Sequence, residues 1–111
     1  MQTIDISDFQ KIEIRVGTVI RVENFEKSRK AAYKIWVDLG ELGIKKSSAQ
    51  ITGLYQIENL IGKQVICVCN FPAKQIADFM SEVLITGFDD GKGHISLATS
   101  DFKVPNGSLL H

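Results

Sequence analysis

The segment from residue 12 to residue 25 constrains the fold of this chain more strongly than any other. Apolar and polar residues alternate over Ile12–Val16, which is the pattern of a half-buried β-strand. After Gly17 the alternation changes phase, so that Ile20 and Val22 become the apolar positions. A glycine at a phase change inside a strand indicates a bulge or a sharp bend. Bent first strands are typical of small barrels, where one strand passes from one sheet layer to the other.

The other patterns also predict strands, with little helix between them. Alternating or mainly apolar runs predict strands over residues 33–39, 64–71, 79–88 and 95–98, and a weaker, polar strand is predicted over 44–51. One or two helical turns are predicted over 52–62, with Gly62 as the stop, and a short turn begins at Ser7, with Gln10 completing a capping box. Strands and helices do not alternate, so we predict an all-β fold, a five-stranded OB-fold barrel with short helices.

The length and the chain ends set the domain organisation. At 111 residues the chain is one domain, 1–111, with the barrel core expected over about residues 12–100. Short apolar segments at the two ends lie outside that core and need cover, either on the domain or on a second subunit. We therefore predict a homodimer in which the terminal extensions carry the interface residues Ile4, Ile6, Phe9, Leu109 and Leu110.

Metal and catalytic chemistry find no support in the residue pattern. Cys67 and Cys69 share one face of a predicted strand, where a disulfide would be strained, and no further cysteine completes a metal site. His94 and His111 stand alone. There is no glycine-rich phosphate loop and no nucleophile elbow. We expect no metal, no cofactor, no catalytic residue and no enzyme activity.

The net charge of zero hides a gradient along the chain. Residues 11–34 carry seven bases and three acids, whereas residues 64–111 carry three bases and five acids. A basic patch that faces a partner and an ordinary mixed surface both fit this distribution. No apolar run approaches the ~18 residues of a membrane span, and the N-terminus lacks the features of a signal peptide, so we expect a cytoplasmic protein without membrane insertion.

Two groups of side chains are candidates for ligand binding. Five basic residues would converge if the loop after the first strand meets the third strand: Arg29, Lys30, Lys34, Lys45 and Lys46. Arg15 is expected on the outer or groove face of the first strand. Lys and Arg side chains bind nucleic-acid phosphates whatever the base sequence. Phe71, Phe79 and Met80 flank polar residues, as in sites that stack bases or hold apolar peptide side chains. A solvated face and a capped barrel end are the alternative interpretations.

Longer motifs resemble those of the tRNA-binding domain family, from about Phe9 to the end of the chain. The resemblance is carried by Ile14–Val19, Val37–Gly40, Leu60–Ile66, Asn70–Phe71 and Ser81–Leu84. It implies an OB-fold core, terminal extensions that form a homodimer, and neither cofactor nor catalysis. Within the family the chain is most similar to a stand-alone, chaperone-like member, which implies affinity for unfolded preproteins and for the export motor.

The resemblance also implies roles for three polar residues. Ser81 matches the serine in the strand that lines the family's tRNA groove, Asn70 the asparagine that ends the preceding strand, and Arg15 the arginine before the bulge glycine. Lys74 is the one base left where tRNA binders carry a basic run, and the loop at residues 27–32 carries the basic residues instead.

From these features we predict a homodimer that binds unfolded polypeptide and assists protein export. Its apolar pockets would be bounded by Phe71, Ile76, Phe79 and Met80. A polar rim would hold acidic segments or backbone and comprises Arg15, Arg29, Lys30, Lys34, Lys45, Lys46, Asn70, Lys74 and Ser81. The alternative function is a stand-alone tRNA-binding protein that uses the same groove.

Overall fold

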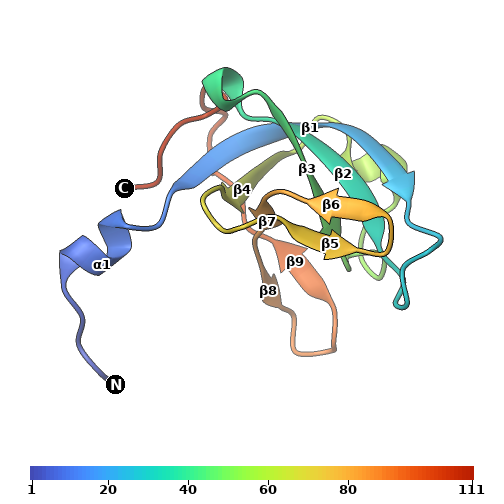
Figure 1. The fold of residues 1–111 in the computed structure, drawn as a ribbon, viewed down its shortest axis with the longest axis horizontal. Coiled ribbons are helices and arrows are strands. Elements are labelled where there is room, and N and C mark those ends of the chain that lie inside the picture. Colours follow the sequence, from blue (N-terminus) through green and yellow to red (C-terminus); the bar gives the residue numbers. More distant parts are fainter.

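One five-stranded antiparallel sheet organises the computed structural model, which describes all 111 residues. Its strand order is β3-β2-β1-β4-β7, and the sheet curls into a nearly closed barrel (Figure 1). This confirms the all-β barrel. The elements in chain order are α1 (Ile6–Gln10), β1 (Ile14–Asn24), β2 (Tyr33–Asp38), a 3₁₀ turn (Gly40–Leu42), β3 (Ile44–Ala49), α2 (Ile57–Leu60), β4 (Gln64–Val68), β5 (Lys74–Ile76), β6 (Phe79–Ser81), β7 (Leu84–Ile85), β8 (Gly87–Asp89) and β9 (Ile95–Leu97).

The long strand β1 is bent, but the irregularity is not at Gly17. β1 pairs first with β4 and then with β2, and the register shifts between Val19 and Arg21. Gly17 itself lies in regular pairing with β4. Its role is close packing, because a Cβ atom there would lie 2.5 Å from Val37 Cγ1 and 2.7 Å from the Asp38 carbonyl oxygen. The expectation of a bulge at the glycine is therefore corrected to a bulge two to three residues later.

The barrel interior is a single apolar cluster. The bulge turns Val19 and Val22 inward and leaves Ile20, which was expected inside, exposed. β2 has the alternation that its sequence predicts: Tyr33, Ile35 and Val37 are buried, and the residues between them are only partly buried. The members of the cluster are Val19, Val22, Tyr33, Ile35, Val37, Leu39, Ile51, Leu60, Val65, Cys67 and Val83. Both cysteines are free, and Cys67 is one of these core residues.

The C-terminal strap, residues 104–110, completes the sheet beside the first half of β1. The Val16 amide donates to the Ser108 carbonyl (3.0 Å), and the Leu110 amide donates to the Ile14 carbonyl (2.9 Å). β2 pairs only with the second half of β1, so the strap takes the edge that β2 leaves free. The strap is therefore an integral part of the barrel wall as well as an apolar end.

The region predicted as one strand over 79–88 is three short strands with different partners. β6 forms a hairpin with β5, β7 pairs with β4, and β8 pairs with β9. The chain turns between these strands at Glu82 and Val83, and Val83 is buried in the core. Long-range pairing thus divides a segment that its sequence predicts to be one strand.

The N-cap of helix α1 lies two residues before Ser7, the N-cap that the predicted capping box requires. Asp5 is the N-cap, and Asp8 completes the box with it. In Figure 1, α1 and the residues before it extend away from the barrel as an arm. Neither helix has the length and apolar character needed to cross a membrane.

Candidate functional site

A second apolar cluster lies on the outer face of the sheet, under the β5–β6 hairpin. Phe79 is 5% exposed and packs edge-to-face on Phe25 and Trp36, with ring centroids 5.4 Å and 6.0 Å apart. Aromatic pairs in this arrangement stabilise one another beyond simple area burial. Because its ring is enclosed, Phe79 serves as a structural anchor for the hairpin and offers no surface for a ligand.

Three cations cover this aromatic cluster. The Lys34 ammonium lies 5.0 Å from the centre of the Phe25 ring and the Lys46 ammonium 5.2 Å from that of Phe79. The Arg21 guanidinium lies 4.5 Å from the Trp36 ring and also pairs with Glu23. Cations over ring faces are attracted by the ring quadrupole. The predicted meeting of Lys34 with Lys46 therefore occurs, and the aromatic rings beneath hold both side chains in place.

The end of β6 is joined to the edge of β3 by unusual hydrogen bonds. The Ser48 amide donates to Ser81 Oγ (3.1 Å). The Glu82 amide donates to the Lys46 carbonyl (2.8 Å), and the Lys46 amide donates to Glu82 Oε1 (3.1 Å). Ser81 and Glu82 thus satisfy edge groups that a neighbouring strand would otherwise pair. The Ser81 hydroxyl is committed to this contact.

The edges of β3 and β7 are not paired with each other, although these are the outer strands of the sheet. A groove of about 540 Å³ lies along this seam, and most of its wall is apolar. The apolar lining comes from β3 and the segment after it and from β5, β7 and β9; it consists of Ala49, Ile51, Ile76, Leu84, Ile85 and Ile95. We call this the seam groove.

A second groove of about 690 Å³ continues from the first. Gln50, Lys74 and Ile76 line both. Its other walls come from the loop between β1 and β2, which contributes Arg29 and Lys30. The loop after β1 therefore meets the β5–β6 hairpin, and three of the predicted rim residues, Arg29, Lys30 and Lys74, come together there.

These three cations have no ion-pair partner in the chain, whose side-chain ion pairs involve other bases. The nearby hairpin acid, Asp78, is paired with Lys27 at 2.8 Å. The hydrogen bond from Lys27 holds the pKa of the Asp78 carboxyl below its ordinary value, so this acid stays ionised and committed to Lys27. No acidic residue lines either groove. The end near Arg29 is therefore a local positive region in a chain of zero net charge.

Arg15 and Asn70 lie elsewhere and hold the chain termini. Arg15 Nη1 donates to the Gly107 carbonyl of the strap (2.7 Å), and its Nε donates to Glu13 (2.7 Å). Asn70 accepts from the Glu13 amide (2.9 Å) and donates to the Lys11 carbonyl (2.8 Å). Both side chains are occupied by bonds within the chain.

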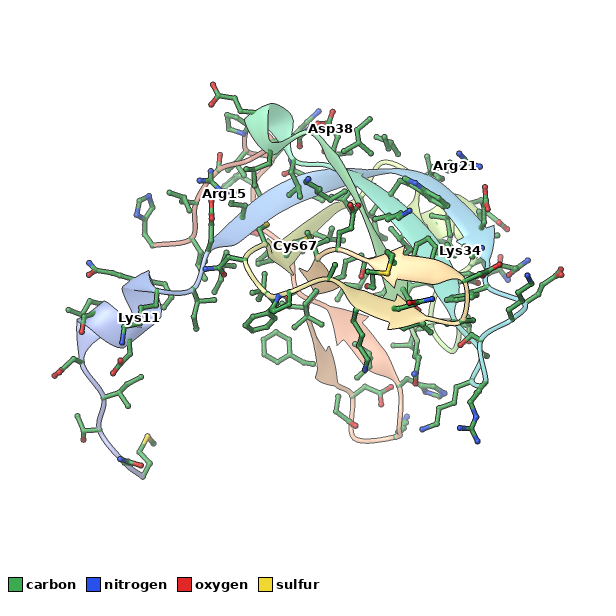
Figure 2. All side chains as sticks on the ribbon, in the orientation of Figure 1. Lys11, Arg15, Arg21, Lys34, Asp38 and Cys67 are labelled. Atoms are coloured by element: carbon green, nitrogen blue, oxygen red, sulfur yellow. The ribbon has the colours of Figure 1, made fainter.

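Figure 2 shows Arg15 beside the C-terminal segment and Lys34 at the far end of the sheet. Arg15 pairs with Cys67 near the start of β1, and Lys34 pairs with Glu23 near its end. Eight residues of strand separate these pairs, which is roughly 25 Å at the usual rise per residue. The predicted rim is therefore divided into separate groups.

Lys45 lies on the opposite face of β3 from Lys46, toward Cys69. Burial raises the pKa of the Cys69 thiol, and Glu13 raises it further, while Arg15 and Lys45 oppose this effect. Burial raises the pKa of Cys67 to about 12. Thiols with raised pKa values are poor nucleophiles. Cys67 belongs to the core cluster and Cys69 packs against it, so both side chains contribute to the packing of the barrel.

The four residues predicted to bound an apolar pocket do not line one pocket. Ile76 and Phe79 are paired and face the sheet, whereas Met80, one residue further along β6, points to the opposite side of the hairpin. Phe71 lies in the loop after β4 and is half exposed. Only Ile76 of the four lines the seam groove. The sequence analysis did not predict the groove residues Leu84, Ile85 and Ile95, because their local pattern is that of any β-strand.

The residues predicted to form a dimer interface lie at the two chain ends, and most of them are exposed. Ile4 and Ile6 are about two-thirds exposed on the arm, and Leu109 and Leu110 are half exposed on the strap. Phe9 is partly buried. A cavity of about 630 Å³ lies between the strap and the outer face of β1 and β4, with Leu109 and Leu110 in its wall.

Comparisons with known proteins agree with this architecture. Residues 14–109 match the family described as "Putative tRNA binding domain". The chaperone CsaA from Bacillus anthracis is 41% identical, with a TM-score of 0.93 over 99% of this chain and 100% of that chain. CsaA from Picrophilus torridus is 44% identical, with a TM-score of 0.92 over 98% of this chain and 100% of that chain.

Curated relatives include much longer enzymes. The methionine–tRNA ligase of Methanocaldococcus jannaschii is 39% identical over 99% of this chain, but the chain spans only 17% of the ligase. The match therefore concerns one domain of that enzyme. With a family match that runs from β1 to the strap, and close structural similarity to two CsaA chaperones over their whole length, the chain belongs to the tRNA-binding domain family.

Proposed function

We propose that this protein is a non-enzymatic, CsaA-type chaperone that binds unfolded polypeptide in the seam groove. The observation that carries the proposal is the opening between the edges of β3 and β7, where the barrel wall is unpaired and apolar. Extended polypeptides bind to such sites by placing alternate side chains in apolar pockets. The similarity to two CsaA chaperones, each covered over its whole length, supports the same role.

Binding in this groove would be weak and reversible at a single site. Burying one leucine-sized side chain stabilises a complex by ~1.5–3 kcal/mol. Association costs several kcal/mol in lost freedom, so one site releases its client readily. A homodimer would present two grooves and raise the avidity through effective concentration.

The proposed homodimer rests on the exposed ends of the chain. The arm carries Ile4 and Ile6 with no barrel surface against them, and Leu109 and Leu110 border an open cavity. A second copy would cover both surfaces. Light scattering after size exclusion at micromolar concentration is expected to give twice the chain mass of 12.3 kDa. A monomeric mass would contradict this part of the proposal.

The client binding is tested by single substitutions in an aggregation assay. Leu84 is half exposed in the groove, so Leu84→Ser leaves the core intact and is expected to weaken suppression of aggregation of a chemically denatured client. Phe88→Ser removes a larger exposed side chain outside the groove and is the matched control. Met80→Ser tests the outer face of the hairpin. Loss of activity in the Met80 or Phe88 variant, with Leu84→Ser unaffected, would refute the groove as the binding site.

The proposed process is protein export in the cytoplasm, with unfolded preproteins and the export motor as partners. A pull-down of purified preprotein and of the motor ATPase by this protein tests these partners. Retention of neither would remove export from the proposal and leave general client binding.

A second candidate function is binding of tRNA. It is favoured by the family match and by the three unpaired cations Arg29, Lys30 and Lys74. Phosphate binding through such residues weakens steeply with salt. A mobility shift with bulk tRNA that is saturable at low salt and lost at moderate salt would support this function, and no shift at low salt would exclude it.

A further inference from the structure

We infer that the seam groove selects apolar segments flanked by acidic residues over the same segments flanked by neutral or basic residues. This inference rests on the proposed polypeptide binding and specifies its substrate class. It follows from the two-part character of one continuous surface: an apolar channel that runs, through Gln50, Lys74 and Ile76, into a cationic end.

The cationic end is uncompensated. Arg29, Lys30 and Lys74 are exposed and form no ion pair, and no acidic side chain lines either groove. Asp78, the acid at the tip of the neighbouring hairpin, is held by Lys27. An acidic segment entering this end therefore meets free cations, whereas a basic segment meets repulsion with no carboxylate to offset it.

The lining of the seam groove favours a polypeptide over a nucleic acid as the ligand. Stacking of bases needs exposed aromatic faces, and in this region Phe79 is buried and the faces of Phe25 and Trp36 are covered by Lys34 and Arg21. The seam groove itself is lined by aliphatic side chains such as Leu84 and Ile95. An extended polypeptide supplies both matching groups, apolar side chains for the channel and carboxylates for the cations.

Three labelled peptides test this selectivity. Each carries the same extended core of six alternating leucine and serine residues, followed by three glutamates, three glutamines or three lysines. Fluorescence anisotropy is measured at 50 mM and 300 mM NaCl. Exposed ion pairs contribute modestly each, so at 50 mM salt we expect the glutamate peptide to bind about tenfold more tightly than the glutamine peptide. The lysine peptide is expected to bind most weakly, and the differences to shrink at 300 mM salt.

Charge-matched variants show where the selectivity resides. Replacing Arg29, Lys30 and Lys74 together with glutamine is expected to bring the Kd of the glutamate peptide to that of the glutamine peptide and to leave the latter unchanged. The control replaces three exposed lysines outside both grooves, Lys63, Lys92 and Lys103, with glutamine and removes the same charge. It is expected to preserve at least most of the tenfold preference.

The outcomes separate this inference from the proposed function. Equal binding of all three peptides refutes the selectivity and leaves polypeptide binding standing. If the control variant loses the preference to the same extent, the net charge of the protein causes the preference and the groove does not, which also refutes the inference. Absence of binding for all three peptides refutes both proposals. Binding of labelled tRNA through the same three residues, with no binding of the glutamate peptide, assigns the cationic end to nucleic acid and overturns the inference.

Discussion

Replacing Gly17 with alanine is expected to destabilise the barrel by about 3 kcal/mol. The new methyl group would lie 2.5 Å from Val37 Cγ1 and 2.7 Å from both the Asp38 carbonyl oxygen and Leu39 Cδ2. Val37 and Leu39 are fully buried, and the third atom belongs to the backbone, so none of them can move aside without shifting the sheet. Overpacking typically costs about 1–3 kcal/mol, and three simultaneous contacts place this variant at the upper end of that range.

Gly53→Ala is the matched control for this prediction. Neither Gly17 nor Gly53 has a positive φ, so alanine is conformationally allowed at both positions. A methyl group at position 53 would meet the ring of His94, a half-exposed side chain that can change rotamer. We expect this variant to lose about 1 kcal/mol or less.

Urea denaturation, followed by the fluorescence of the single tryptophan, Trp36, measures both variants at one protein concentration. Gly17→Ala should lower the midpoint strongly with an unchanged m value and lower Tm by roughly 10–20 °C. A loss below 1 kcal/mol for Gly17→Ala would refute the reasoning, because it would show that the wall of the barrel yields at this point. An equal loss in both variants would refute the distinction between a fixed wall and a movable side chain.

Three further predictions concern the C-terminal strap, the Lys27–Asp78 pair and the two cysteines. Deleting residues 104–111 removes three backbone hydrogen bonds to β1 and should cost about 3 kcal/mol or more, measured as a shift of the urea midpoint; an unchanged midpoint would show that the strap is dispensable. The Asp78 carboxyl should titrate below its ordinary value of 3.8 by NMR and return toward it in Lys27→Met. Because the pKa of Asp78 is lowered in the folded state, the pair stabilises the fold at pH values above the pKa of the unfolded state. This stabilisation is lost as the pH falls through the pKa of the folded state. An NMR titration midpoint at the ordinary value would contradict the pairing. At pH 8, iodoacetamide should leave Cys67 unmodified in the folded protein and modify Cys69 slowly, as read by mass spectrometry, and rapid labelling of Cys67 would contradict its burial.

Local sequence determined the identity of most elements. The alternation over β2 predicts its inward and outward residues correctly, because a strand with one buried face must place apolar side chains at every second position. Gly62, predicted as the stop after the helical turn, has a φ of +89°, which glycine adopts without strain. The family resemblance rests likewise on short motifs that can be read along the chain.

Long-range pairing decided what local sequence did not. The sequence predicts one strand over residues 79–88, but the chain leaves the β5–β6 hairpin and then joins β4, so it turns at Glu82 and Val83. The turn joins β6 to β3 through Ser81 and Glu82 and opens the seam beside β7. The hydrophobic pattern within this segment does not indicate which strands its residues pair with.

The candidate site depended most on tertiary structure. Arg15 and Asn70 were interpreted as rim residues, yet their side chains bond to groups 92 and 57 residues away in the sequence. The amino-acid sequence by itself determined a small strand-rich barrel with basic residues concentrated after its first strand. Only the folded structure decided which bases remain free, because a charge is neutralised by whatever the fold places beside it: Asp78 reaches Lys27 across 51 residues and leaves Arg29, Lys30 and Lys74 unpaired.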